Sequence, residues 1–142
     1  FDTAYSLSQP SDAALDEIFA ISQQRSPSDC IIIHLIQGAA TRVEPSATAF
    51  ALREAHLSIA NVGLWVEGDG AANIAWARAA YERMLPFADK GVYVNFQGDD
   101  ADEESLRAAY RANYQRLAEI KARYDRYNIF QLNRNIPPTS HK

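Results

Sequence analysis

The chain has one cysteine, Cys30, among 142 residues. A disulfide within the chain and a cysteine-based zinc site are therefore excluded. Cys30 opens the apolar run CIIIHLI, where a buried small hydrophobe is the expected role and a reactive thiol is the alternative. So little cysteine argues against a disulfide-rich secreted domain, and we expect a cytoplasmic protein.

Long apolar runs and an excess of basic residues are also missing. No run approaches the roughly 18 residues that a membrane-spanning helix needs, and no signal peptide is visible. The 14 basic residues are scattered among 18 acidic ones, which gives a net charge of −4. Neither nucleic acid nor a membrane is therefore an expected partner.

Phosphate loops and metal clusters are equally scarce. Gly68-Asp69-Gly70 lacks the continuation of a dinucleotide-binding GxGxxG motif, so we interpret it as a turn. The histidines, His34, His56 and His141, are far apart and have no partners at metal-ligand spacing. His34 lies in an apolar run and is expected to be a satisfied sheet histidine rather than a ligand or a base. His56 would reach a pocket if its strand faces one.

The acidic stretch from Asp99 to Glu104 has two readings. It lacks the alternation and the glycine of a calcium loop. Carboxylates before a helix are favourable caps and complement the helix dipole. We therefore expect the N-terminal cap of a helix rather than a cation site.

Hydrophobic spacing predicts three helices and several strands. The first helix is capped by Ser11, ends before Pro27 and uses a face of Leu15, Ile18, Phe19 and Ser22. The second covers 71–87, with a stripe of Ile74, Ala77, Tyr81 and Met84 or Leu85. The third covers 103–124, with a stripe of Leu106, Tyr110, Asn113, Leu117, Ile120 and Tyr124.

Strands are expected at 30–36, 56–66 and 91–96, and residues 39–43 either pair back or continue the sheet. In the second strand, alternation places Ser58 and Ala60 on one face and Leu57 and Ile59 on the other. The fold class is therefore α+β, an antiparallel or mixed sheet of three to four strands with helices packed on one face.

Tyrosine, with seven residues, is in excess. Most tyrosines are expected to pack with one edge in water. Tyr93 differs because it lies beside Asn95 at the end of a predicted strand, where binding residues are often found. Packing remains the alternative for both residues.

The C-terminal third carries a recognisable signature. It consists of Tyr93-Val94-Asn95-Phe96, Tyr110-x-x-Asn113-Tyr114-x-Arg116-Leu117, Ile120-Lys121-x-x-Tyr124-Asp125-x-x-Asn128-x-Phe130 and Asn133-x-Asn135-Ile136-Pro137-Pro138. It resembles the C-terminal segment of berberine-bridge-enzyme-like, FAD-linked oxidoreductases. Upstream, Gly38-Ala39-x-x-Arg42-Val43, Ala49-Phe50-x-x-Arg53 and Gly63-x-Trp65 resemble the preceding substrate-domain segment of bacterial members.

The resemblance implies that residues 1–90 are the later part of a substrate-binding domain and residues 91–142 the C-terminal segment, together one compact unit. In such enzymes a separate domain binds FAD, and substrate lies between that flavin and an antiparallel sheet. The FAD-binding domain, of the same or a companion chain, is then a partner, together with a small-molecule substrate and possibly a second copy of the chain. The first residue, Phe1, is not a methionine, which fits a fragment.

The resemblance also implies the site. Tyr93, Asn95, Phe96, Ser58 and Ala60 would line the substrate and flavin pocket. Asn128 and Asn133 would contact the cofactor, with helix capping and packing as their alternative role. Plant members carry a proton-abstracting Tyr or His at the position of Phe96, and Phe cannot take a proton, so no catalytic residue is assigned.

Three smaller departures from the family pattern are Arg111 where Gly is usual, Arg126 where Pro is usual and Leu52 where His is usual. The sequence thus predicts part of an enzyme that oxidises a small organic substrate by hydride transfer to flavin, inactive as this chain alone. The alternative is a non-catalytic α+β module for assembly or small-ligand binding. A natural reading frame that begins near Phe1 would favour this alternative.

Overall fold

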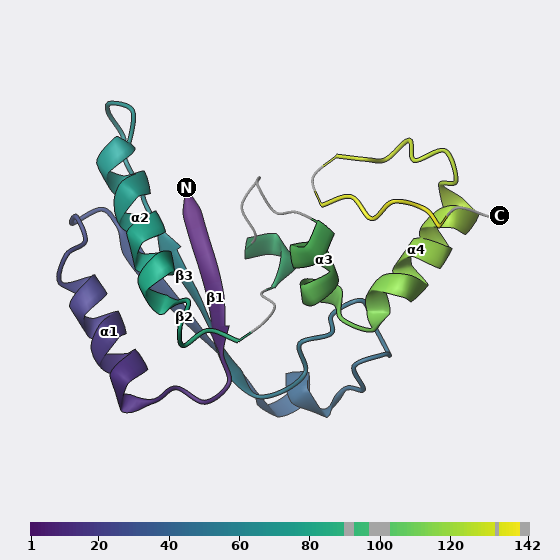
Figure 1. Ribbon diagram of the computed structural model, residues 1–142, viewed down its shortest axis with the longest axis horizontal. Coiled ribbons are helices and arrows are strands. Elements are labelled where there is room, and N and C mark those ends of the chain that lie inside the picture. The colour runs from purple at the N-terminus through teal and green to yellow at the C-terminus, as the bar shows by residue number, and fades with distance from the viewer. Residues whose placement is uncertain (90–92, 97–102, 133, 140–142) are drawn as a thin grey trace.

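The computed structural model describes residues 1–89, 93–96, 103–132 and 134–139. Three antiparallel strands, β1 (Asp2–Leu7), β2 (Cys30–Ile36) and β3 (His56–Val62), form one sheet in the order β1-β3-β2. The α+β prediction is confirmed (Figure 1). β1 was not predicted. Its paired residues on β3 lie 50 to 60 positions further along the chain, and nothing local in the sequence indicates that pairing.

The register gives the sheet two distinct faces. Tyr5 and Ile33 flank Ile59 on the odd-numbered face, and Ser6 and His34 flank Ser58 on the even-numbered face. Side chains alternate between faces along a strand, so this assignment extends over the whole sheet. We call these the odd face and the even face. The predicted separation of Ser58 and Ala60 from Leu57 and Ile59 follows from this register.

Two helices, α1 (Asp12–Ser22) and α2 (Ala71–Met84), cover the odd face. Ser11 caps α1 as predicted, because its Oγ accepts a hydrogen bond of 3.2 Å from the amide of Ala14. The buried face of α1 was predicted only in part: Ile18 packs against the core, but Leu15 and Phe19 are exposed, and the buried residues are Ala14 and Ile21. Both sets have helical spacing, so periodicity alone could not choose between them.

The core lies between these helices and the odd face. Met84, which ends α2, is fully buried, and the Thr3 hydroxyl donates to the Ala77 carbonyl oxygen, which ties β1 to α2. Truncating a buried side chain of this size typically costs about 2–5 kcal/mol of the free energy of unfolding. The buried members of this cluster are Tyr5, Leu7, Ala14, Ile21, Ile59, Ala80 and Met84.

The turn predicted at Gly68-Asp69-Gly70 begins α2. Gly68 and Gly70 both have positive φ, at 81° and 68°. A Cβ at Gly70 would lie 2.2 Å from the Trp65 ring, so this position admits only glycine. β3 was expected to reach residue 66 but ends at Val62. The next residue, Gly63, donates its amide to the Phe1 carbonyl oxygen.

The predicted helix over 103–124 is two helices, α3 (Glu103–Tyr110) and α4 (Asn113–Tyr124). Arg111, between them, has φ of 49°, which is left-handed and ends an α-helix. The break changes the buried stripe: Ile120 and Tyr124 are exposed. The buried residues of the two helices are Leu106 and Asn113, as predicted, together with Ala109, Tyr114, Ala118 and Ala122.

Two predicted strands are short 3₁₀ helices. η1 (Gly38–Arg42) replaces the sheet segment expected at 39–43, and η2 (Val94–Phe96) replaces the end of the strand expected at 91–96. Residues 90–92 lie outside the described residues. Tyr93 to Phe96 have a strand-like composition, but η2 packs against β1 without joining the sheet. Strand propensity needs a partner edge to take effect.

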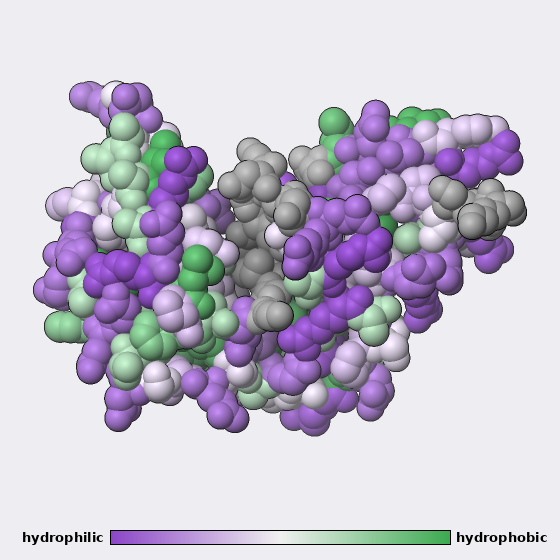
Figure 2. Space-filling model, in the orientation of Figure 1, coloured by the Kyte–Doolittle hydropathy of each residue, from purple (hydrophilic) through white to green (hydrophobic). Residues whose placement is uncertain are grey.

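The segment after α4 carries a group of exposed apolar side chains. Figure 2 shows hydrophobic atoms along the upper edge of the C-terminal lobe, where Figure 1 draws this segment. Phe130 and Leu132 are more than four-fifths exposed. Of the described residues, no helix has the length and apolar character to cross a membrane.

β2 is an edge strand with an apolar surface. Ile33 and Leu35, on the odd face, are 50% and 59% exposed, and Ile32, on the even face, is 38% exposed. On β1 and β3, by contrast, the even-face residues Ala4, Ser6, His56, Ser58 and Ala60 are buried. The exposed apolar side chains of the sheet are thus concentrated on β2. A flat apolar edge is a template for pairing with another strand.

The chain alone should therefore self-associate through β2. Leu35→Lys should make it monomeric, because the lysine cannot be buried in a strand-to-strand contact. Sedimentation velocity over a concentration series measures this. Val66→Lys is the matched control, because Val66 is fully exposed but lies outside the sheet. Equal sedimentation of both variants and the parent would contradict a role for β2.

The buried phenol of Tyr5 makes stability depend on alkaline pH. Burial raises the pKa of Tyr5 from 10.0 to about 12. Above pH 10 the unfolded chain releases this proton and the folded chain keeps it, so stability falls between pH 10 and pH 12. The expected loss is at most about 3 kcal/mol. Urea unfolding at pH 9 and pH 11.5 should show it, and Tyr5→Phe should remove that part of the slope.

Candidate functional site

The even face carries polar side chains without partners. Ser6 and Ser58 lie opposite each other on β1 and β3, each 4% exposed, and neither hydroxyl has a hydrogen-bond partner in the described part of the chain. A buried polar atom left unpaired costs roughly 1–3 kcal/mol. Unpaired hydroxyls are therefore candidates for binding a ligand or ordered water.

A pocket of about 290 Å³ opens at one end of this face. It lies where β1 ends, where the loop entering β3 approaches, and where α3 meets α4. Most of the side chains that line it are polar or charged. They come from four separate parts of the sequence. The described residues that line it are Ser6, Ser8, Leu52, Glu54, His56, Asp89 and Arg111.

His56 forms the floor of this pocket with a defined tautomer. Its Nδ1 lies 2.8 Å from the carbonyl oxygen of Glu54. A carbonyl oxygen only accepts, so Nδ1 carries a proton, and in the neutral ring Nε2 then holds a lone pair. Nε2 is buried and has no partner among the described residues, and the whole residue is 7% exposed.

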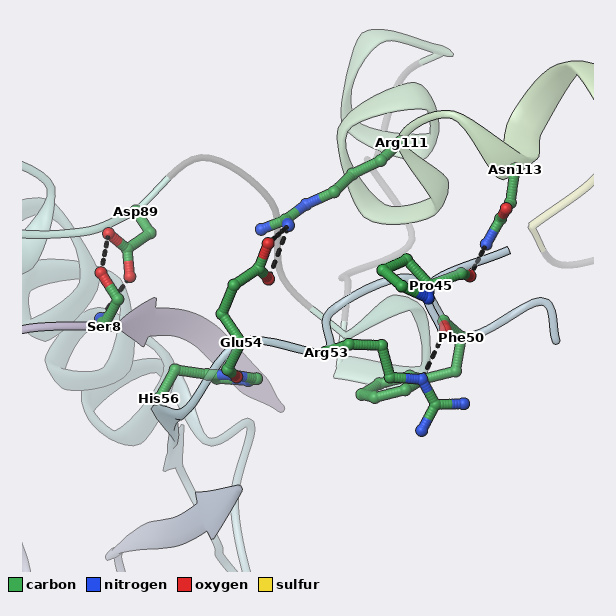
Figure 3. Close-up of polar contacts among 9 residues, drawn as sticks. All are labelled: Ser8, Pro45, Phe50, Arg53, Glu54, His56, Asp89, Arg111 and Asn113. Atoms are coloured by element: carbon green, nitrogen blue, oxygen red, sulfur yellow. Dashed lines mark hydrogen bonds and ion pairs between the residues drawn. The ribbon is translucent and has the colours of Figure 1, made fainter. Parts of the chain in front are cut away.

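Two charged groups form the walls (Figure 3). The Arg111 guanidinium donates from one nitrogen to both carboxylate oxygens of Glu54, at 2.8 and 2.7 Å. Across the pocket, Asp89 accepts hydrogen bonds from the Ser8 amide and from the Ser8 hydroxyl, the latter at 2.9 Å. The pKa of Glu54 is lowered, first by its own backbone amide and further by Arg111, against the opposing effect of partial burial.

A second, more apolar pocket of about 210 Å³ contains Tyr93. The Tyr93 ring packs edge-on against Phe50, with centroids 5.7 Å apart, and its hydroxyl accepts from Asn95 at 2.8 Å. Leu52 lines both pockets. The backbone of Phe96 lies in η2, and its side chain is outside the described residues.

The predicted pocket residues therefore fall into two groups. Tyr93 and Asn95 lie by the apolar pocket, while Ser58 and Ala60 are buried on the even face of β3. Nothing in the described residues joins these groups into one cavity. His56 was recognised only as conditional on its strand facing a pocket, and it does line one.

The loop after α4 is held by Asp125. Its carboxylate accepts from the amides of Ile129 and Phe130 and from the Lys121 ammonium group. The hydrogen bond from Lys121 is the largest cause that keeps the pKa of Asp125 below its ordinary value. This network holds a loop that exposes the side chains of Tyr127, Ile129 and Phe130.

Asn128 belongs to the same loop. It has φ of 53°, a conformation that asparagine tolerates, and its amide donates to the Asp125 carbonyl oxygen at 2.9 Å. Its side-chain Oδ1 is buried without a partner among the described residues. Asn128 therefore has both the capping role and a spare acceptor, while Asn133 lies outside the described residues.

Metal ligation finds no support in the described part of the chain, where no three His, Cys, Asp or Glu side chains come together. Cys30 is a free, half-buried thiol at the start of β2. Glu103 and Glu104 lie in the first turn of α3, as expected for dipole-complementing residues, and Asp99 to Asp102 lie outside the described residues.

Comparison with known proteins identifies the family. Residues 92–137 match the family described as berberine and berberine like. The chain is 33% identical over 102 residues to the uncharacterized FAD-linked oxidoreductase YgaK of Bacillus subtilis, covering 71% of this chain and 22% of that protein. It is 34% identical over 103 residues to YvdP, a second uncharacterized FAD-linked oxidoreductase of the same organism, covering 72% and 23%.

Solved structures share the fold. The berberine bridge enzyme of Eschscholzia californica superimposes on 99% of this chain and 33% of its own, with a TM-score of 0.84 at 21% identity. The chain belongs to the berberine-bridge-enzyme-like, FAD-linked oxidoreductases and corresponds to their C-terminal portion. It spans less than a quarter of the length of the two Bacillus relatives.

The position of Arg111 accounts for a departure from the family pattern. The resemblance implies glycine there, and the left-handed backbone favours glycine. Arginine accepts the unfavourable conformation and adds the ion pair with Glu54. Both side chains are more than a third exposed, so the pair contributes only about 0.2–1 kcal/mol.

Arg111→Gly should therefore be more stable than Arg111→Ala by about 1 kcal/mol, because both variants lose the ion pair and only alanine keeps the backbone cost. Urea unfolding measures the difference. Arg107, inside α3, is the matched control and should give the opposite order. If the same variant, alanine or glycine, is the more stable one at both positions, then Arg111 does not have the left-handed conformation.

Proposed function

We propose that the chain forms one wall of the substrate pocket of an FAD-dependent oxidoreductase that oxidises a small organic substrate by hydride transfer to flavin. The observation that carries the proposal is the correspondence with the C-terminal portion of relatives named as FAD-linked oxidoreductases. Flavin, when bound, supplies the hydride acceptor, and the residues of this chain bind and orient the substrate.

The even face is the surface proposed to meet the substrate and the flavin ring. It carries Ser58 and Ala60, whose side chains are 4% and 2% exposed in this chain, so they would shape the wall from beneath its surface. Tyr93, Asn95 and Phe96 are proposed to line the adjoining wall. Phe96 would contribute shape and no proton transfer.

The proposed partner is an FAD-binding domain, of the same or a companion chain. The loop that Asp125 holds by hydrogen bonds supports this, because it presents Tyr127, Ile129 and Phe130 to solvent at more than 70% exposure. Apolar exposure of this extent on an ordered loop is typical of a contact surface. Asn128, with its spare acceptor, and Asn133 are the residues proposed to reach the cofactor. We place this function in the cytoplasm.

The test compares the 142-residue chain with the protein made from the full natural reading frame. The longer protein should purify with the visible absorbance of a flavin, and a substrate should bleach it under anaerobic conditions. The chain alone should carry no flavin and turn over nothing, because most of the cofactor contacts are expected to lie in the separate domain.

The two outcomes that count against the proposal are distinct. Flavin copurifying stoichiometrically with the 142-residue chain would contradict a cofactor site located elsewhere. A natural reading frame that begins near Phe1 would favour a non-catalytic α+β module instead. Phe130→Ser in the longer protein adds a positional test, since it should weaken flavin retention if the loop contacts the other domain.

A further inference from the structure

We infer that Arg53 and Asn113 are positioning residues of the proposed substrate pocket. Together they hold the segment 45–53 in the place where the Phe50 ring packs against Tyr93. The inference rests on the proposed function for what the pocket does, and it adds two residues to which that function gives no role. Neither residue is expected to touch the substrate.

The segment 45–53 contains no helix or strand, and residues 45–49 are exposed. Its shape therefore depends on hydrogen bonds from side chains to its backbone. Phe50, in this segment, lines the apolar pocket. Leu52 lines both pockets and so lies between them. The position of the segment thus sets the width of the apolar pocket and its separation from the polar one.

Arg53 holds the segment from within. Its Nε donates to the Phe50 carbonyl oxygen at 3.1 Å (Figure 3). Nη1 donates to the Ala40 carbonyl oxygen at 3.0 Å, and Nη2 donates to the Thr48 hydroxyl at 2.7 Å. The guanidinium also lies over the Phe50 ring, 4.7 Å from its centroid. Lysine has one nitrogen and no plane to stack, so it cannot make all of these contacts.

Asn113 holds the same segment from α4. Its side-chain nitrogen donates to the carbonyl oxygens of Pro45 and Thr48, at 2.7 and 3.0 Å, and the residue is buried. The segment is 65 and 68 residues away from Asn113 at these two points. Thr48 is bound by both positioning residues, through its carbonyl oxygen by Asn113 and through its hydroxyl by Arg53.

The network ends at Tyr93. The Phe50 ring has the Arg53 guanidinium beside it and packs edge-on against the Tyr93 ring. Arg53, Tyr93 and Asn113 come from three separate stretches that carry the family resemblance, and the structure joins them through one segment. A binding wall must be held within about 0.5 Å by the residues around it, and this network is placed to do so.

The contact between the Phe50 and Tyr93 rings is measured in the 142-residue chain by NMR, as the NOE between their protons. Arg53→Lys should abolish this NOE while the amide signals of β3 persist. Arg116→Lys is the matched control. Arg116 donates to the Ser46 carbonyl oxygen of the same segment at 3.0 Å, a bond from one nitrogen that lysine can replace, so the NOE should remain.

Asn113→Asp tests the second residue, because it keeps the shape of the side chain and removes both donated hydrogen bonds. It should also abolish the NOE. Gln115→Glu makes the same change from amide to carboxylate at an exposed position of α4, and it should leave the NOE intact. A lower unfolding midpoint with an intact NOE would mean that Asn113 only stabilises the chain.

The longer protein supplies the functional measurement. Arg53→Lys should retain flavin, because the loop held by Asp125 is unchanged. It should raise the KM of the substrate that bleaches the flavin several-fold, with a smaller change in kcat, as expected when binding is lost equally in the ground state and the transition state.

The inference is overturned by an NOE that survives Arg53→Lys or Asn113→Asp, by its loss in either control, by loss of the β3 amide signals, or by an unchanged KM. Failure of the proposed function has a different sign, a longer protein without flavin. In that case the NOE in the 142-residue chain still decides whether the two residues hold the segment.

Discussion

The pairing register of β3 is the constraint on which the rest of the structure depends. All seven of its residues pair with β2, and six of them, Leu57 to Val62, also pair with β1. Because side chains alternate, a slip of one residue would move Ile59 out of the core and turn Ser58 towards the helices. The apolar contact of Tyr5, Leu7 and Ile59 with α1 and α2 holds the register. Once that packing fixes the register, the alternation of side chains places Ser6 and Ser58 on the even face.

Local signals in the sequence were sufficient for part of the fold. The Ser11 cap, the strand at 30–36 and the glycine turn before α2 depend on neighbouring residues, and they are where the sequence indicates. β1 and the break at Arg111 are not local. β1 is a strand because β3 is beside it, and Arg111 reaches a left-handed conformation where Glu54, 57 residues earlier, can pair with it.

The site was harder to predict than the fold for the same reason. The same pocket is lined by Glu54, Asp89 and Arg111, which are far apart in the sequence. Their proximity depends on the conformation of two loops and of the break between α3 and α4. The tautomer of His56 depends on a carbonyl two residues away, whose direction no motif encodes. Ser58 could be assigned to a face from alternation alone. The resemblance in the C-terminal third identified the family because it preserves a motif, and the pocket by His56 lies largely outside that motif.

One structure would test the account most directly: the protein from the full natural reading frame, with FAD bound, solved by crystallography. The account predicts that the flavin ring lies over the even face, nearer to Ser58 and Ala60 than to α1 or α2. It also predicts that the loop held by Asp125 contacts the cofactor-binding domain. A ring lying on the α1 and α2 side of the sheet, with the even face turned to solvent, would contradict it.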